Sequence, residues 1–461
     1  MAVRGKQEQA FPSIAGSSYY WEQIAKLESL LAESRSPHAF QTASELFGLQ
    51  RGIIFLLSAC EKTVRDGKRL KKEAEETGDV DEQENLAITL PQNKALVSVI
   101  QSIADGLAWR VLDFDRAFIR VMSSPKKPRG SVDFSVAYPG MEDVAIRFMY
   151  ENGSRVVFND ITHYLRIGDL TEIQPSGQVI VHELKKDGRT VKNAYTIANQ
   201  SPNAGVSKQL KNLVTSQKAF DERKIRVGDE TTIFEEVGLP FANNLAAISD
   251  LISEARKSFF ARRKFGDYLE VLCQDAKATI SHSLNHGPQF WRRFDHSSSF
   301  DSSDLVVPID SLASWNEEDG DFPRNKAPYS IYPFSISDCL GLLSGELLLK
   351  SRLNLSALHR MYKANGWKVS PFGIEQFRQE YEANKHYARD AFAFKGTMKA
   401  FTISRNGFNM DLSLAMLFQI ATDFVKPDLL LATAEHIYST SSRDDGGLIV
   451  LSFASEKDVW I

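Results

Sequence analysis

Apolar residues recur at helical spacing through the first part of the chain. Tyr20, Ile24 and Leu27 lie three or four positions apart, as they would on one face of an α-helix. The same spacing continues in two further stretches, and helices are therefore predicted over residues 19–33, 39–60 and 93–122. We expect residues 1–89 to form an N-terminal helical region.

Charges of both signs dominate the segment between the second and third predicted helices. Gly67 and Gly78 lie within residues 61–84, where each glycine weakens a helix. We expect a solvated helix end followed by a mobile loop, and the alternative is a binding arm.

The pattern changes after SSPKKPRG at residues 123–130, where prolines and glycine end the helical period. The stretches SVDFSVAYP, DVAIRFMYENG and SRVVFND are rich in β-forming residues and are predicted to be strands. A basic helix is predicted next, over residues 206–223, so residues 90–228 should form an α/β domain. A longer helix is predicted over residues 242–265, and residues 229–461 are expected to form a C-terminal α/β region of unassigned role.

The stretch GDLTEIQPSGQVIVHELKK, residues 168–186, is predicted to be a β-hairpin. Pro175 and Gly177 are turn-forming residues, so the turn is centred near Ser176. Counting outward from this centre places Asp169 opposite Glu183. Two carboxylates are therefore expected at the open end of the hairpin.

Opposed side chains in an antiparallel pair are about 5 Å apart at Cβ, and like charges there are destabilising. A cation would relieve this repulsion, and carboxylate oxygens suit Mg²⁺, which keeps several waters and commonly binds substrate phosphate. Strand alternation places Lys185 on the face of Asp169 and Glu183, whereas His182 and Leu184 point the other way. The ammonium of Lys185 could then orient the attacking water or stabilise charge developing on a phosphate.

The acid at Asp169, the apolar run before Glu183 and the Glu183-Leu184-Lys185 tripeptide together resemble the core motif of the PD-(D/E)xK nuclease superfamily. Gly168 stands where the family name has proline. The resemblance implies a restriction-endonuclease-like α/β core, with a central mixed sheet flanked by helices. It also implies a nuclease that requires Mg²⁺ or Mn²⁺, with Asp169 and Glu183 as metal ligands and Lys185 as a catalytic residue.

Further residues follow from the same resemblance. Family members often carry a glutamine or basic residues on the helix after this strand, and SKQLKNL supplies Gln209 as a catalytic candidate with Lys208 and Lys211 for phosphate. Many also use an acid from the preceding helix, for which Asp105 is the candidate third metal ligand. If the strands are registered differently, Asp160 would replace Asp169 as the metal acid.

Composition restricts the remaining possibilities. The chain has 461 residues and a formal net charge of −4, which argues against bulk electrostatic binding of nucleic acid but allows a local basic groove. No run approaches the roughly 20 apolar residues of a membrane span, and the N-terminus lacks the apolar core of a signal peptide. We therefore expect a cytoplasmic protein without a membrane partner. The three cysteines lie far apart and suit buried thiols.

The predicted function is metal-dependent hydrolysis of phosphodiester bonds, with DNA favoured over RNA. The resemblance implies a role in antiviral defence or repair, and both a homodimer and a partner protein of a defence complex are compatible with it. The main rival is an inactive nucleic-acid-binding or scaffold protein of the same fold.

Two other patterns are weaker. A hydrolase built on His282, His286 and His296 lacks the HExxH glutamate that a zinc site of this spacing would have. The stretch RKSFFARRKF, residues 256–265, interleaves cations with phenylalanines, which fits a nucleic-acid groove and the basic outer face of a helix equally well.

Overall fold

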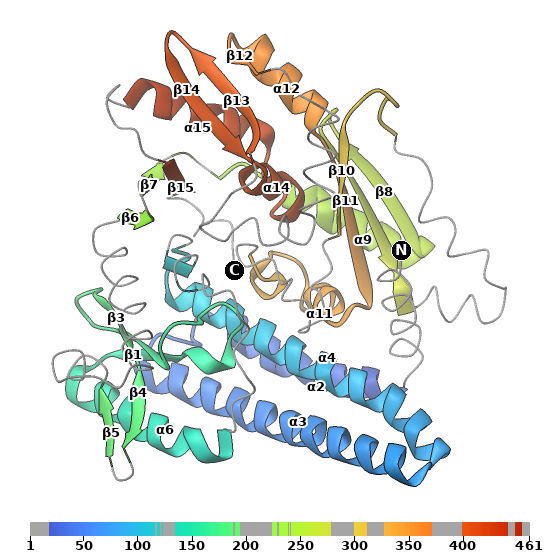
Figure 1. Cartoon of the computed structure of the whole chain (residues 1–461), viewed down its shortest axis with the longest axis vertical. Helices are drawn as coiled ribbons and strands as arrows, with labels where there is room; N and C mark the ends of the chain where they lie inside the picture. The colour runs from blue at the N-terminus through green and yellow to red at the C-terminus, as the bar shows by residue number, and fades with distance from the viewer. Residues whose placement is uncertain are drawn as a thin grey trace. The chain divides into compact units, whose positions relative to one another are not determined.

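The structure is a computed structural model that describes residues 18–115, 118–119, 122, 134–187, 190–193, 224–227, 230–237, 239, 241–277, 299–310, 327–370, 399–440 and 448–453. It is a mixed α and β protein (Figure 1). The chain divides into two compact units, Met1–Arg226 with Pro328–Ile331, and Val227–Ala327 with Tyr332–Ile461.

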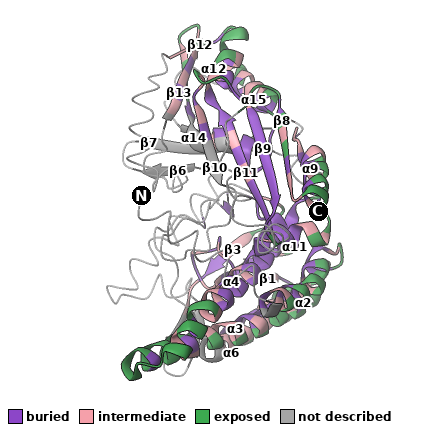
Figure 2. Cartoon of the chain, turned by 90° about the vertical axis from the view of Figure 1, so that its right-hand side faces the viewer, coloured by how far each residue is buried: buried purple, intermediate pink, exposed green. Residues whose placement is uncertain are grey.

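The first unit is built on long helices. They are α2 (Ser18–Arg35), α3 (Ala43–Thr77), α4 (Val80–Val111) and α6 (Phe134–Asn152), with the short helix η4 (Tyr329–Ile331) against α4. The helix predicted over residues 19–33 is confirmed by α2. Helix α3 begins with a capping box, in which Glu45 N donates to Thr42 Oγ1 at 3.1 Å and Thr42 N donates to Glu45 Oε2 at 2.9 Å. The second half of α4 is almost entirely buried (Figure 2).

The charged segment after residue 60 is helical, and the prediction of a loop there was wrong. Helix α3 continues through Gly67, where an added Cβ would lie 3.2 Å from Leu90 Cδ1, so the glycine allows α3 and α4 to approach closely. Ion pairs between residues four positions apart, such as Arg69 with Glu73, support the exposed end of the helix. Gly78, with φ of 72°, does end it.

Helix α4 begins directly afterwards, because the side chain of Asp79 accepts a hydrogen bond from Glu82 N. The helix therefore starts earlier than predicted and runs without a break through the expected domain boundary between residues 89 and 90.

By length and apolar composition alone, α3 is a candidate membrane span. Core helices of soluble proteins pass the same test. In this structure Leu46, Leu49, Ile53 and Leu57 of α3 are buried, and α3 packs against α4.

Residues Phe134–Asn152, which cover most of the stretches SVDFSVAYP and DVAIRFMYENG, form one helix, α6, and the prediction of two strands there was wrong. Met141, Val144 and Ala145 are buried, and Phe148 follows three residues later. This spacing is helical, and it places one apolar face of α6 against α3 and the sheet. The β-branched and aromatic residues before Pro139 obscured the helical period.

A three-stranded antiparallel sheet follows, in the order β1 (Arg155–Phe158), β2 (Leu170–Ile173) and β3 (Val179–His182). The strand predicted in SRVVFND is confirmed by β1. The edge of β1 is capped by the buried side chain of Gln50 from α3, which donates to Val156 O at 2.7 Å and accepts from Phe158 N at 2.9 Å. The amide of Gln50 thus replaces a neighbouring strand, and the hairpin of interest is the part of the sheet away from this edge.

The second unit is organised around a four-stranded antiparallel sheet of order β10-β11-β9-β8. Its described elements are β7 (Glu230–Val237), α9 (Leu245–Ser258), β8 (Phe260–Phe265), β9 (Leu269–Asp275), β10 (Val306–Asp310), α11 (Ile336–Ser344), β11 (Leu347–Asn354), α12 (Leu355–Ala364), β12 (Lys368–Val369), β13 (Lys399–Arg405), β14 (Phe408–Ser413), α14 (Leu414–Thr422), α15 (Pro427–Thr440) and β15 (Leu448–Phe453), and β6 (Lys224–Val227) spans the boundary between the units. Every residue of β9 is buried (Figure 2). Strands β12, β13 and β14 form a second antiparallel sheet, and β15 pairs in parallel with β7.

The helix predicted over residues 242–265 is only partly correct. Helix α9 ends because Phe259 adopts a left-handed conformation with φ of 67°, and the chain continues as strand β8. Gly266, with φ of 55°, then turns β8 into a hairpin with β9. The basic stretch RKSFFARRKF is therefore a helix end joined to a strand, and it does not present one helical face.

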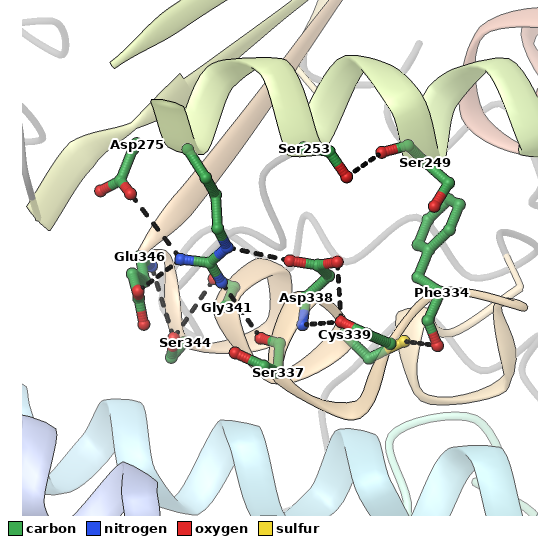
Figure 3. Close-up of polar contacts among 12 residues, drawn as sticks. Ser249, Ser253, Asp275, Phe334, Ser337, Asp338, Cys339, Gly341, Ser344 and Glu346 are labelled. Carbon is green, nitrogen blue, oxygen red and sulfur yellow. Dashed lines mark hydrogen bonds and ion pairs between the residues drawn. The ribbon is translucent and has the colours of Figure 1, made fainter. Parts of the chain in front are cut away.

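Arg256, in the last turn of α9, links this helix to β9, to α11 and to Glu346, the residue before β11. Figure 3 shows its partners Asp275, Asp338 and Glu346. Its guanidinium donates to Asp338 Oδ1 at 2.9 Å and to Glu346 Oε1 at 2.8 Å, and lies 3.7 Å from Asp275 Oδ2. An added Cβ on Gly341 would lie 2.9 Å from Arg256 Nη2, so this glycine leaves room for the guanidinium. Burial lowers the pKa of Arg256, but the hydrogen bonds to Glu346 and Asp338 outweigh burial and the pKa is raised.

We expect Arg256→Met to lower the free energy of unfolding by about 3 kcal/mol, because it leaves largely buried carboxylates without their cation. Arg69→Met is the matched control, since the side chains of Arg69 and its partner Glu73 are 61% and 52% exposed, against 26% and 14% for Arg256 and Asp338. Loss of the exposed Arg69–Glu73 pair should cost less than about 1 kcal/mol. Urea denaturation of both variants makes the comparison, and equal losses would show that Arg256 is not a structural centre of the unit.

Candidate nuclease-like site

The predicted hairpin is present, with the predicted register. Leu170 pairs with His182, Thr171 with Val181, and Ile173 with Val179, so the turn is centred on Ser176. The next position outward on each side is Asp169 and Glu183. Both residues are half-buried, at the point where the ladder of β2 and β3 ends.

Asp169 is hydrogen-bonded to His182 and Leu184, the residues on either side of Glu183 in the chain. Its backbone N–H donates to His182 O at 2.7 Å, and its Oδ2 accepts from Leu184 N at 2.5 Å. These two hydrogen bonds fix the Asp169 carboxylate beside the peptide segment that carries Glu183. The structure therefore brings together the two acids on which the predicted site depends.

The strand that carries the Glu-x-Lys tripeptide is interrupted, contrary to the expectation of one continuous strand. Strand β3 ends at His182, and a new strand β4 (Leu184–Asp187) begins after Glu183 and pairs with β5 (Thr190–Asn193). Lys185 lies in β4, where its backbone pairs with Lys192. The side chain of Lys185 lies outside the described residues, so its position on the face of Glu183 stays a prediction.

Gly168, which stands in place of the family's proline, has a conformational and a steric reason to be glycine. Its φ is 69°, in the left-handed region. An added Cβ would lie 2.8 Å from His182 O and would overlap Val181 Cγ1. The absence of a side chain lets the chain enter β2 close enough to β3 for the bond between Asp169 N and His182 O.

We expect Gly168→Ala to destabilise the protein by about 1–3 kcal/mol, because a strained φ is combined with a steric overlap. The matched control is Gly177→Ala, where φ is 84° but nothing lies within 4 Å of the added Cβ. Both variants bear the cost of the left-handed conformation, and only Gly168→Ala meets a neighbour. Denaturation midpoints measure the difference, and equal losses would show that the close approach is unimportant.

Asn159, at the start of the short helix η1 (Asn159–Ile161), holds the loop that leads to Asp169. It is fully buried, and its backbone N–H donates to Asp169 O at 3.0 Å. Its side chain donates to Ile167 O at 2.8 Å and accepts from Thr171 Oγ1 at 2.8 Å. Asn159 was not among the predicted site residues, although an asparagine directly after the apolar residues 156–158 is a recognisable turn signal.

Asp105, the candidate third metal ligand, is fully buried in α4 and bonded elsewhere. Its Oδ1 accepts from His163 N at 2.7 Å, and its Oδ2 lies 2.7 Å from His163 Nδ1. Tyr164 N also donates to Oδ1, at 3.3 Å. This geometry favours a structural role for Asp105, in which it holds the loop between β1 and β2 against α4.

Asp160, the alternative metal acid, lies in η1 after the end of β1. The alternative required a different strand register. The observed register pairs Phe158 with Leu170 and Leu170 with His182, which places Asp169 beside Glu183.

A buried polar cluster lies on the other face of the hairpin. Glu172 and His182 are 2% and 3% exposed, and His182 Nε2 lies 2.8 Å from Glu172 Oε2. Glu172 Oε1 accepts from Ser154 Oγ at 2.7 Å and from Asn152 Nδ2 at 3.1 Å. Burial raises the pKa of Glu172, but the hydrogen bonds from Ser154, Asn152 and His182 outweigh burial and the pKa is lowered. His182 was predicted to point away from Asp169 and Glu183, but its partner Glu172 was not predicted.

Other predicted residues lie outside the described part of the chain. They are Lys208, Gln209 and Lys211 of the basic segment, and His282, His286 and His296. In the stretch RKSFFARRKF, the three basic residues of β8 have acidic neighbours: Arg262 with Glu270, Arg263 with Glu254, and Lys264 with Asp267. This pairing favours a structural surface over a phosphate-binding groove.

The donor set at the hairpin end suits a hard divalent cation. Within the described ranges, no three His, Cys, Asp or Glu side chains are grouped to hold a metal ion. Mg²⁺ does not require three, because one or two carboxylates commonly bind it together with waters and substrate phosphate. Asp169 and Glu183 offer carboxylate oxygens from two chain segments that are hydrogen-bonded to each other, and in this respect they fit.

No protein-family model matches the chain, and no curated protein or solved structure is significantly similar to it.

Proposed function

We propose that the protein is a metal-dependent nuclease of the PD-(D/E)xK type, with a restriction-endonuclease-like core in its first unit. The observation that supports this most strongly is the hairpin register, because it brings Asp169 next to Glu183 as the motif requires. The order of α6, β1, β2 and β3, with the three strands antiparallel, is compatible with such a core.

Asp169 and Glu183 would hold Mg²⁺ or Mn²⁺, which supplies a nucleophilic water at neutral pH and polarises the phosphate. Asp169 is held for this role by its bonds to His182 and Leu184. Lys185 would orient the attacking water or stabilise charge on the phosphoryl oxygens, and Gln209 would assist at the same centre. Lys208 and Lys211 would contact neighbouring phosphates.

The substrate and setting are proposals that rest on the same resemblance. We favour DNA over RNA, a cytoplasmic location and a role in antiviral defence or repair, acting as a homodimer or with a partner protein. The second unit is available for target recognition or partner binding.

The test is a cleavage assay of the full chain on single- and double-stranded DNA and RNA, with Mg²⁺, with Mn²⁺ and with chelator. The proposal expects cleavage of at least one substrate with metal and none with chelator. Equal cleavage in chelator would indicate a contaminant or a metal-independent enzyme, and no cleavage of any substrate would contradict the proposal.

A nucleic-acid-binding protein that has this fold but does not cut is the second candidate. The observation that favours it is the hydrogen bond from Leu184 N to Asp169 Oδ2, which occupies one carboxylate oxygen within the protein itself. This candidate predicts tight binding of nucleic acid without cleavage under every metal condition.

A further inference from the structure

His182, the residue before Glu183, is held through both its backbone and its side chain. The backbone carbonyl of His182 accepts from Asp169 N at 2.7 Å, and the imidazole of His182 lies 2.8 Å from the carboxylate of Glu172. Leu170, two residues before Glu172, is the direct cross-strand partner of His182. Side chains alternate along a strand, so Glu172 and His182 share one face of the hairpin. Asp169 and Glu183 are the next positions outward, directly beyond the ends of β2 and β3.

The Glu172 carboxylate is itself anchored to the segment that leads from α6 into β1. Asn152, the last residue of α6, and Ser154 both donate to Glu172 Oε1. The ring of Phe148, one turn earlier in α6, lies against the imidazole of His182, with centroids 4.6 Å apart and planes inclined by 31°. A continuous chain of contacts therefore runs from α6 through Glu172 to His182, the neighbour of Glu183.

Stability alone does not require this arrangement. Replacing a buried polar pair by apolar residues of similar volume is often neutral or stabilising. Hydrogen bonds are directional, whereas apolar packing is not. The bonds of His182 therefore hold its imidazole in one orientation and fix the end of β3. Residues that orient metal ligands through such contacts commonly affect metal affinity strongly.

We propose that Glu172 and His182 are positioning residues that hold the end of β3, and with it the Glu183 carboxylate, in the geometry that binds the divalent metal. This inference rests on the proposed function. Glu172 and His182 do not touch the metal or the substrate, and they act through the backbone between His182 and Glu183.

The experiment measures Mn²⁺ binding to the full chain by electron paramagnetic resonance, which does not depend on cleavage. Asp169→Asn/Glu183→Gln defines the background without the site. Glu172→Gln tests the carboxylate alone, and the double variant Glu172→Met/His182→Leu removes both polar partners at once. Val157→Ala is a control for general destabilisation, since Val157 is 1% exposed in β1 and contributes no group to the polar cluster.

We expect the two Glu172 variants to raise the Kd for Mn²⁺ about tenfold. In a cleavage assay, kcat at fixed Mg²⁺ should fall while KM for nucleic acid stays near that of the wild type. Val157→Ala should lower the denaturation midpoint and leave the Kd unchanged. A merely structural role for the pair would instead make the Glu172 variants behave like Val157→Ala.

The possible outcomes distinguish a failure of the positioning role from a failure of the nuclease proposal. Wild-type Mn²⁺ affinity in a folded Glu172→Met/His182→Leu protein would overturn the positioning role and leave the nuclease proposal standing. If the double variant does not fold, wild-type Mn²⁺ affinity in Glu172→Gln would overturn the positioning role instead. The wild-type protein must also bind an Mn²⁺ ion that the double variant Asp169→Asn/Glu183→Gln does not bind. If the two proteins bind Mn²⁺ equally, the nuclease proposal is overturned, and the positioning role with it.

Discussion

Asp169→Asn and Glu183→Gln should each abolish cleavage and leave the protein folded. Each change removes a ligand charge but keeps the shape of the side chain, and the amide introduced by Asp169→Asn retains an oxygen that can accept from Leu184 N. We expect a loss of at least about 10²- to 10³-fold in rate, as for other groups that stabilise charge directly in a transition state. Relief of repulsion between the acids should leave the stability of the metal-free protein unchanged or slightly higher.

Asp160→Asn is the matched control for these two variants. It removes the same charge from the loop that leads to Asp169, but the observed register places it outside the acid pair. Purified proteins, with denaturation midpoints measured in parallel, make the comparison. Wild-type turnover in Asp169→Asn or Glu183→Gln, or loss of turnover in Asp160→Asn alone, would contradict the assignment of the metal acids.

Lys185→Met should lower the cleavage rate by about two to three orders of magnitude, whereas Lys186→Met should stay within a few fold of wild type. A lost electrostatic stabiliser of the transition state is typically worth about 3 kcal/mol or more. The two lysines have equal charge and adjacent positions in β4, so only the direction of their side chains distinguishes them. Lys185→Met should still bind Mg²⁺ and nucleic acid, because the two acids are unchanged.

Single-turnover cleavage with saturating Mg²⁺ compares the two lysine variants. The strand is interrupted at Glu183, so the alternation of side chains is not continuous from β3 into β4. The comparison therefore tests which of the two lysine side chains lies on the side of the acids. If Lys186 proves to be the essential residue, the interruption at Glu183 places the side chain of Lys186, and not that of Lys185, on the side of the acids. The Glu-x-Lys spacing would then not be the functional spacing.

The hairpin could be predicted from the sequence because its signals are local. Pro175 and Gly177 determine where the turn lies, and once the turn is centred on Ser176 the pairing of Leu170 with His182 follows. The position of Asp169 beside Glu183 needed no tertiary information.

The contacts that fix the hairpin could not be predicted in the same way. Asn159 and Glu172 act through partners between 8 and 20 residues away in the chain, and their partners are known only once the sheet and α6 are packed. The steric need for Gly168 depends equally on the approach of His182. Asp105 could be named as an acid on the preceding helix, but its burial and its bond to His163 are tertiary features.

The errors in secondary structure have related causes. Residues 134–152 contain β-forming residues and Pro139, yet they form α6 because one helical face packs on α3 and the sheet. Gly67 was treated as a helix breaker, but α3 contains it because a small residue is needed opposite Leu90. In both cases tertiary packing outweighed local propensity.

In a crystal of the full chain soaked in Mn²⁺, the anomalous signal locates the ion independently of any activity. We expect an ion bound by the carboxylates of Asp169 and Glu183. An ion at His282, His286 and His296 instead, or no ion at the end of the hairpin, would contradict this expectation.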